Sequence, residues 1–247
     1  MRSLYCGDCL EVMKEIPDGS IDLVLTDPPY GTTACKWDTV IDLELMWSQL
    51  KRVIKPKGAI ILFGAEPFAS RLRMSNIKEY KYDLVWDKLV SGSPGTAKYR
   101  PMPAHENILI FGVGRLVYNP QMKVGKPYVD NRSQKRDHAI EHKYGYARWV
   151  PQVNKGTRFP TSVFSMVRPK EKGVGGAFGK LRHPTQKPVA LMEYLIRTYT
   201  NPFDTVLDFT MGSGTTGVAA RNIARYFIGI ELDKGYFEIA KGRIENA

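Results

Sequence analysis

Short apolar runs alternate with segments of helical period along most of the chain. One run, Ile21–Leu25, is followed by Thr26 and then by the tetrapeptide Asp27-Pro28-Pro29-Tyr30. An apolar run of this length that stops at prolines is typical of a buried strand. Neither proline has an N–H to donate, so the pair cannot continue a central strand. We therefore expect the tetrapeptide just past the carboxyl end of the strand, where open α/β sheets bind ligands.

The same two periods predict further elements, which together form an α/β pattern. Further strands are predicted over residues 59–63, 82–86, 107–111, 205–209 and 226–231. Helices are predicted over residues 42–53, 66–74, 217–224 and 234–244. We expect Pro56-Lys57-Gly58 to close the first helix and to separate it from the strand that follows.

The tetrapeptide offers a carboxylate, a proline carbonyl and an aromatic ring within four residues. These groups could hold an exocyclic amine and stack on the ring that carries it. The plainer interpretation is a strand-ending turn, because Asp and Pro are ordinary turn residues. The tetrapeptide alone does not decide between the two interpretations.

A second motif, Gly212-Ser213-Gly214, lies between a predicted strand and a predicted helix. A strand, a glycine-rich turn and a helix bring a nucleotide-like ligand against backbone amides. Glu231 ends the next strand, 23 residues after Asp208, and an acid about 20 residues beyond such a turn binds ribose hydroxyls in dinucleotide folds. The turn lacks the Gly-Lys-Ser/Thr of a P-loop and the third glycine of the NAD fingerprint. The pattern favours a ligand with adenosine and no phosphates, namely S-adenosylmethionine.

With both motifs in view, the chain resembles the amino-methyltransferases that act on DNA, over nearly its whole length. Residues 7–11, Gly-Asp-Cys-Leu-Glu, are similar to the family segment beside the cofactor's adenine. Residues 183–188, His-Pro-Thr-Gln-Lys-Pro, are similar to the motif before the helix that leads into the glycine strand. Aspartate at position 27 is similar to the enzymes that methylate adenine N6, whereas serine there usually marks cytosine N4.

The resemblance implies a fold and a set of site residues. The fold is a Rossmann-like, S-adenosylmethionine-dependent methyltransferase with circularly permuted motif order, the β group, in which the N-terminal and C-terminal strands share one sheet. The implied catalytic residues are Asp27, Pro28, Pro29 and Tyr30. The implied cofactor-binding residues are Asp8, Cys9, Thr185, Lys187, Asp208, Gly212, Ser213, Gly214, Thr215 and Glu231. Phe209 and Thr210 depart from the family pattern, which usually reads Asp-Pro-Phe before the glycines.

Positive charge is concentrated in one internal segment. The chain has a formal net charge of +11, and residues 113–182 alone carry 15 Lys and Arg against 4 Asp and Glu. Such a stretch can neutralise DNA phosphates, and its aromatic residues argue against the alternatives of a solvated face or a flexible tail. We interpret residues 113–182 as a target-recognition region for double-stranded DNA, inserted between a catalytic half (1–112) and a cofactor-binding half (183–247). The DNA-binding candidates are Arg132, Lys135, Arg136, Arg148, Lys155 and Arg158.

Composition excludes several other classes. No apolar stretch reaches the ~18 residues of a membrane span, and the N-terminus lacks the apolar core of a signal peptide. Three cysteines indicate a reducing compartment, so we expect a cytoplasmic protein. The pairs Cys6/Cys9 and His138/His142 lack further ligands, so we expect no metal. The resemblance also implies a homodimer.

Three functions remain in competition. Methylation of adenine N6 in DNA, after the base is flipped out of the duplex, is the leading hypothesis. Cytosine-N4 methylation is the alternative, because the same pocket handles a similar amine. A non-catalytic DNA-binding protein on this fold is disfavoured by Asp27, Tyr30 and the two glycines, and RNA or protein glutamine as substrate commonly goes with Asn at position 27. Cytosine-C5 methylation generally uses a Pro-Cys pair, which the chain lacks.

Overall fold

The computed structural model describes residues 2–31, 39–89, 92, 94–130, 152–166 and 186–247. The chain forms two compact units, one of residues 1–119 and 162–247 and one of residues 120–161. The larger unit is built on an eight-stranded sheet in the order β1-β12-β11-β2-β3-β5-β4-β10. Among the described residues, no helix is both long and apolar enough to cross a membrane.

The strands and helices of the larger unit follow the predicted alternation. The strands of the sheet are β1 (Arg2–Cys6), β2 (Ile21–Thr26), β3 (Ile54–Gly64), β4 (Tyr80–Asp87), β5 (His105–Phe111), β10 (Val163–Ser165), β11 (Thr205–Asp208) and β12 (Tyr226–Glu231). The α-helices are α1 (Cys9–Val12), α2 (Leu43–Val53), α3 (Phe68–Ser75), α4 (Val189–Tyr199), α5 (Thr215–Asn222) and α6 (Lys234–Glu245). The described residues also include two 3₁₀ helices, η1 (Met13–Glu15) and η2 (Pro94–Thr96).

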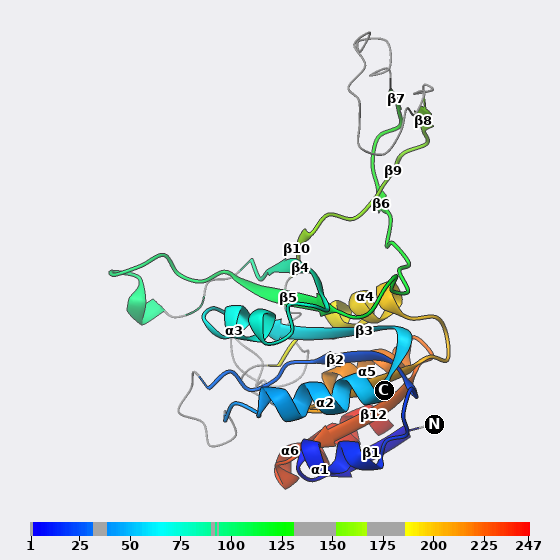
Figure 1. Cartoon of the computed structure of the whole chain (residues 1–247). Helices are drawn as coiled ribbons and strands as arrows, with labels where there is room; N and C mark the ends of the chain where they lie inside the picture. The colour runs from blue at the N-terminus through cyan, green and yellow to red at the C-terminus, as the bar shows by residue number, and fades with distance from the viewer. Residues whose placement is uncertain (1, 32–38, 90–91, 93, 131–151, 167–185) are drawn as a thin grey trace. The chain divides into compact units, whose positions relative to one another are not determined.

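The N-terminal and C-terminal strands lie side by side in one sheet. In Figure 1 the blue strand β1 lies beside the orange-red strand β12, and the two pair in parallel. Strand β11 pairs with β2 through Val206 opposite Leu23 and Leu207 opposite Val24. The predicted closure of one sheet from both ends of the chain is therefore confirmed. Strand β5 runs antiparallel between β3 and β4, so its first residues lie at the edge where the parallel strands end.

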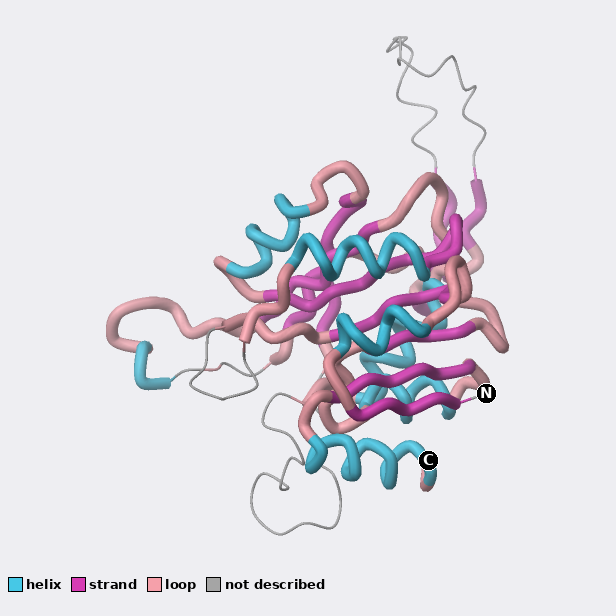
Figure 2. Tube along the Cα trace, turned by 60° about the horizontal axis from the view of Figure 1, so that its bottom comes forward, coloured by secondary structure: helices cyan, strands magenta, loops and turns pink. Residues whose placement is uncertain are grey.

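Helices cover both faces of the sheet, as the cyan helices across the magenta strands show in Figure 2. Alternate residues of each strand enter opposite cores because side chains alternate across a sheet. In β3, Ile61 and Phe63 belong to the core cluster that includes residues of α4, α5 and α6, whereas Ile60 and Leu62 belong to the cluster that includes residues of α2 and α3. Burial on both faces explains why the strands are nearly continuous apolar runs in the sequence.

The start of β3 differs from the expectation. The residues predicted to separate it from the helix, 56–58, belong to the strand itself, which begins at Ile54. Its pairing with β2 jumps from Ile54 opposite Ile21 to Ala59 opposite Leu23. Pro56 is tolerated because it lies in this irregular part, outside the regular ladder. A β-carbon on Gly58 would lie 2.8 Å from the Asp22 carbonyl oxygen, so the close approach of the two strands requires glycine.

In its described residues, the smaller unit contains two antiparallel ladders. Strand β6 (Lys123–Val124) pairs with β9 (Thr157–Arg158), and β7 (Tyr128–Asp130) pairs with β8 (Gln152–Asn154). The unit lies within the predicted recognition region of residues 113–182. Residues 163–165 of that region instead form β10, which pairs with β4 in the large sheet.

Candidate functional site

The candidate site lies where the order of the sheet reverses. From β2 the chain passes through α2 to β3 on one side, whereas from β11 it passes through α5 to β12 on the other. Ligands of open α/β sheets bind at such a switch point, beside the carboxyl ends of the diverging strands. Strand β2 ends at Thr26, so residues 27–30 lie just past its carboxyl end, as predicted.

The Asp27 carboxylate is held on both of its oxygens. The Tyr30 hydroxyl donates to Oδ1 at 2.6 Å, and Lys187 Nζ donates to Oδ2 at 2.5 Å. The Thr210 hydroxyl donates to the Asp27 backbone oxygen at 3.3 Å. The Asp27 side chain keeps 22% of its surface exposed. The structure therefore presents a partly accessible carboxylate that is oriented by Tyr30 and Lys187, on a backbone that Thr210 also holds.

The Tyr30 ring stacks on Phe68, with centroids 5.1 Å apart and planes 23° apart. Phe68 is the first residue of α3 and is buried. Sequence reasoning missed this aromatic partner, although its place just after the carboxyl end of β3 was a signal that could have indicated it. The stack fixes the plane of the Tyr30 ring.

Lys187, predicted to bind the cofactor, contacts the catalytic candidate Asp27 in this structure. Its Nζ also lies 3.0 Å from Glu106 Oε2, and Glu106 Oε1 lies 3.2 Å from Lys88 Nζ. Burial alone would lower the pKa of Lys187, but the carboxylates of Asp27 and Glu106 outweigh it and raise that pKa. Burial would raise the pKa of Glu106, and the two lysines lower it overall. Glu106 is not among the residues predicted from the sequence, because the predicted strand begins one residue later, at Asn107.

Asp208 joins three elements through its buried carboxylate. The Thr26 hydroxyl donates to Oδ1 at 2.5 Å, the Thr216 hydroxyl donates to Oδ2 at 2.6 Å, and the Thr210 amide donates to Oδ1 at 3.2 Å. Burial raises the pKa of Asp208 to about 6, and these hydrogen bonds limit the rise. The carboxylate predicted to bind cofactor thus ties β11 to β2 and to α5.

The glycine turn uses the left-handed backbone conformation twice, at Gly212 (φ 52°) and Gly214 (φ 77°). Gly214 is the N-cap of α5. A β-carbon there would lie 2.9 Å from Ala240 Cβ in α6, so the turn and α6 pack closely only around glycine. Gly212 N donates to Glu231 Oε2 at 2.8 Å, which brings the predicted turn and the predicted acid together.

Glu231 lies at the carboxyl end of β12 with a buried side chain. Its Oε1 accepts a hydrogen bond from Asp233 N at 2.8 Å, and burial raises its pKa. A carboxylate has about four acceptor positions, so two backbone donors leave acceptor capacity on Glu231.

Ser213 and Thr215 are anchored to α6 by Arg243, which the sequence analysis did not select. Arg243 Nη1 donates to the Ser213 carbonyl oxygen at 2.6 Å and to the Thr215 hydroxyl at 3.3 Å. The Ser213 hydroxyl donates to Gln186 Oε1 at 3.3 Å. Both side chains are buried, so in this structure they hold the turn in place.

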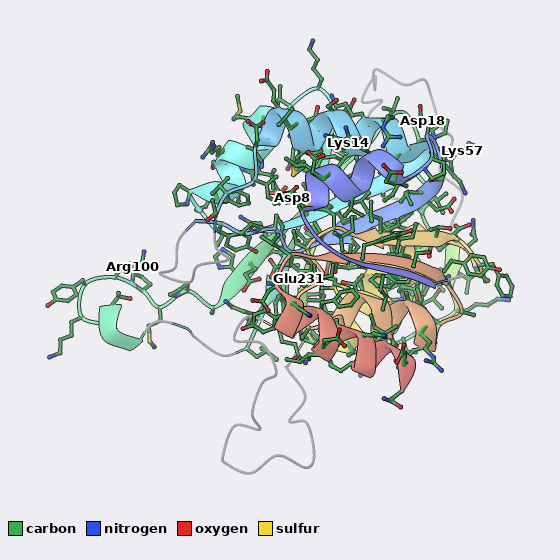
Figure 3. The ribbon with its side chains drawn as sticks, turned by 90° about the horizontal axis from the view of Figure 1, so that it is seen from below. Asp8, Lys14, Asp18, Lys57, Arg100 and Glu231 are labelled. Atoms are coloured by element: carbon green, nitrogen blue, oxygen red, sulfur yellow. The ribbon has the colours of Figure 1, made fainter. Side chains whose placement is uncertain are left out.

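Asp8 and Cys9 begin α1, beside the end of β12. Asp8 Oδ1 caps the helix by accepting from Leu10 N at 2.8 Å, and Gly7 N donates to the Glu231 carbonyl oxygen. Figure 3 shows Asp8 and Glu231 at one end of the sheet and Asp18 and Lys57 at the opposite end. Burial and the Asp8 carboxylate raise the pKa of Cys9 to about 12. The thiol is therefore not an activated nucleophile.

Two of the DNA-binding candidates lie in the described part of the smaller unit. Lys155 is exposed. Arg158 is engaged within the unit: its guanidinium lies 4.5 Å from the Tyr128 ring centre and donates to Asn154 Oδ1 at 2.6 Å and to the Lys126 carbonyl oxygen at 2.5 Å. The DNA-binding candidates Arg132, Lys135, Arg136 and Arg148 and the cofactor-binding candidate Thr185 lie outside the described residues. Within the described ranges, no three His, Cys, Asp or Glu side chains gather as a metal site requires.

The sheet order and the glycine turn at its switch point define a Rossmann-like methyltransferase fold. The family model for N6/N4-type DNA methylases matches residues 21–242, so the chain belongs to the DNA methylase family. M1.MboII of Moraxella bovis, a Type II methyltransferase, is 30% identical over 249 residues, which cover 96% of this chain and 94% of that protein.

Solved structures show the same fold. The crystal structure of the M1.HpyAVI–SAM complex is 27% identical, has a TM-score of 0.64 and covers 99% of both chains. The PvuII DNA methyltransferase, which is cytosine-N4-specific, is 21% identical with a TM-score of 0.68, over 98% of this chain and 86% of its own. The second likeness is evidence for the fold alone.

Proposed function

We propose that this DNA methylase transfers a methyl group from S-adenosylmethionine to adenine N6 in double-stranded DNA, after the base is flipped out. Family membership and the M1.HpyAVI–SAM complex support the cofactor. The single observation that carries the adenine assignment is Asp27, a fixed carboxylate just past β2 at the switch point. A target amine inside a base pair cannot reach such a carboxylate unless the base leaves the stack.

The residues present suit an adenosine ligand. The left-handed turn at Gly212 and Gly214 leads into the N-terminus of α5, and Glu231 at the end of the next strand keeps acceptor capacity for hydroxyl groups. We assign cofactor binding to this turn, to Glu231 and to the Asp8 segment beside it. When bound, the cofactor supplies an electrophilic methyl group on a sulfonium.

The chain's own residues hold and orient the target base. Asp27 and the Pro28 carbonyl accept the two amine hydrogens, and Tyr30 stacks on the extruded ring. The lone pair of an adenine amine is conjugated into the ring, and fixing both hydrogens localises it toward the methyl carbon. The nitrogen–carbon bond forms as the carbon–sulfur bond breaks, and Asp27 is placed to accept the proton that the amine loses. Orientation supplies much of the acceleration.

The proposal is tested by expressing the wild type in a bacterial host that lacks DNA methylation and sequencing its DNA with modification-sensitive reads. We expect N6-methyladenine at one short motif with the wild type and none with Asp27→Ala. Asp18→Asn is the matched control, because Asp18 is an exposed aspartate at the opposite end of the sheet. N4-methylcytosine would replace the adenine assignment with the cytosine alternative. Asp27→Ala with wild-type methylation would refute the role of Asp27.

Double-stranded DNA is the proposed partner of the smaller unit. Lys123, Lys126 and Lys155 are exposed there, and exposed lysines bind phosphates by releasing counterions. Arg158 is better placed to stiffen the ladders than to contact DNA, because both of its terminal nitrogens already donate within the smaller unit. The homodimer implied by the resemblance stays a prediction, which analytical ultracentrifugation of the purified protein would test.

A further inference from the structure

A row of alternating charges leads from Lys88 through Glu106 and Lys187 to Asp27. The nitrogen–oxygen separations along it are 3.2, 3.0 and 2.5 Å. The Lys187 side chain is only 5% exposed and those of Glu106 and Lys88 are 13% and 17% exposed. Two positive and two negative groups make the row neutral, which is the condition under which charges tolerate burial.

Each member comes from a different element at the carboxyl edge of the sheet. Lys88 follows β4, Glu106 is the second residue of antiparallel β5, Lys187 precedes α4, and Asp27 follows β2. The Phe63 ring of β3 lies 5.0 Å from Lys187 Nζ and offers no competing hydrogen-bond acceptor. The carboxylates that face Lys187 within hydrogen-bond distance are therefore Asp27 and Glu106.

The row bears on the proposed reaction because both Asp27 oxygens already receive protein donors. A carboxylate has about four acceptor positions, so a target amine held by Asp27 shares an oxygen with Tyr30 or with Lys187. Tyr30 is fixed by its stack on Phe68. Lys187 has a second carboxylate 3.0 Å away, so it can release Asp27 without leaving a buried charge unpaired.

We propose that Lys187 and Glu106 are positioning residues that orient the Asp27 carboxylate, and that Glu106 takes over Lys187 when the target amine arrives. This inference rests on the proposed methyl transfer at Asp27. It assigns to Lys187 a role toward the carboxylate in place of the cofactor contact expected from the sequence. Glu106 contacts neither the base nor the cofactor in this scheme. It controls how readily Lys187 releases the Asp27 carboxylate.

The net charge of the row predicts the direction in which each variant changes the methylation rate. Glu106→Gln leaves Lys187 with Asp27 as its one charged partner, so the amine competes less well. Lys187→Met removes the positive charge that lies between the carboxylates of Asp27 and Glu106. The double variant Lys187→Met/Glu106→Gln removes one charge of each sign and restores neutrality. Both single variants should therefore be slow, and the double variant should be faster than Glu106→Gln.

The assay is the single-turnover rate of methylation at saturating cofactor and DNA. We expect Glu106→Gln to lower this rate by about tenfold or more and to leave cofactor affinity within about twofold, because the change is isosteric and lies outside the glycine turn. The double variant should recover about threefold or more over Glu106→Gln. Glu79→Gln, which removes a charge that pairs with Lys51 instead, is the matched control and should stay within about twofold of the wild type.

Additive losses in the double variant would assign the row a merely structural role and overturn the proposal. A Glu106→Gln rate equal to the wild type would overturn it as well. Thermal unfolding and calorimetric cofactor binding identify any variant that fails to fold. If Glu106→Gln fails to fold, Glu106→Asp, which keeps the charge, takes its place. Glu106→Asp should methylate faster than Lys187→Met.

A second readout needs no substrate. Lysine labelled with ¹³C at Cε reports the Lys187 titration, with its signal assigned by its loss in Lys187→Met. We expect its pKa in the wild type to lie above the ordinary 10.5 and to fall in both Asp27→Asn and Glu106→Gln. A pKa at or below the ordinary value would overturn the proposal. A wild type that binds S-adenosylmethionine and methylates no DNA refutes both the proposed function and the positioning role of Lys187 and Glu106. An active wild type with an unaffected Glu106→Gln variant refutes the positioning role alone.

Discussion

Thr26→Val probes the junction between the two halves of the sheet. The Thr26 hydroxyl donates to the buried Asp208 carboxylate, and valine keeps the shape while removing that donor. A hydrogen bond to a charged group contributes roughly 1.5–3 kcal/mol. For a chain of this length, a loss of about 2 kcal/mol lowers Tm by about 4–8 °C. Thr198→Val is the matched control, because this buried hydroxyl donates to the neutral Tyr194 carbonyl oxygen within its own helix.

The loss of stability in Thr26→Val should depend on pH, and this dependence is the more specific prediction. The pKa of Asp208 is raised from 3.8 to about 6 in the folded protein, so the folded state binds more protons between these values. The contribution of Asp208 to stability therefore falls as pH rises from about 4 to about 6, by about 3 kcal/mol in total. Thr26→Val removes a donor that favours the charged form and raises this pKa further. The loss of stability should be larger near pH 8 than near pH 5.

The assay is urea unfolding at the two pH values for the wild type, Thr26→Val and Thr198→Val, with linear extrapolation to water. The expected result is a loss in Thr26→Val that grows with pH and a smaller loss in Thr198→Val that does not. A Thr26→Val loss that is equal at both pH values, or no larger than that of Thr198→Val, would refute the reasoning about Asp208.

Three further predictions concern the turn, the thiols and the smaller unit. Gly214→Ala should lower stability by more than Gly19→Ala in urea unfolding and should weaken calorimetric cofactor binding, because both glycines have a positive φ and only Gly214 has neighbours that a β-carbon would meet at 2.9 Å. At about pH 8, Cys9 should react with iodoacetamide much more slowly than the exposed Cys6, since burial raises the Cys9 pKa to about 12; equal rates by mass spectrometry would contradict this. Lys155→Gln should reduce the salt slope of DNA binding by about one, and an unchanged slope in a titration of salt against affinity would place DNA elsewhere.

The sequence was sufficient wherever the decisive signal was local. Apolar runs with proline or glycine punctuation located β2, β11 and β12, and the two motifs at their carboxyl ends lie together at the switch point as the strand order requires. The acid Glu231 and the turn residue Gly212 are joined by a hydrogen bond, which their spacing in a strand-turn-helix-strand unit already indicated.

The rest depends on contacts between distant parts of the chain. Lys187 and Asp27 are 160 residues apart, and no period in the sequence indicates which carboxylate a buried lysine will meet. Glu106 fell outside the predicted strand because polar residues begin β5, although the antiparallel direction of β5 brings them to the site. Arg158 was selected for its charge, and only the ladder geometry shows that Tyr128 and Asn154 engage it.

The most direct test of the central claim uses purified protein, duplex DNA and S-adenosylmethionine with a deuterated methyl group, followed by nucleoside mass spectrometry. We expect the label in N6-methyladenine with the wild type and with Asp18→Asn, and we expect its loss with Asp27→Asn while the cofactor still binds. Label in N4-methylcytosine, or equal labelling of adenine by Asp27→Asn and the wild type, would contradict it.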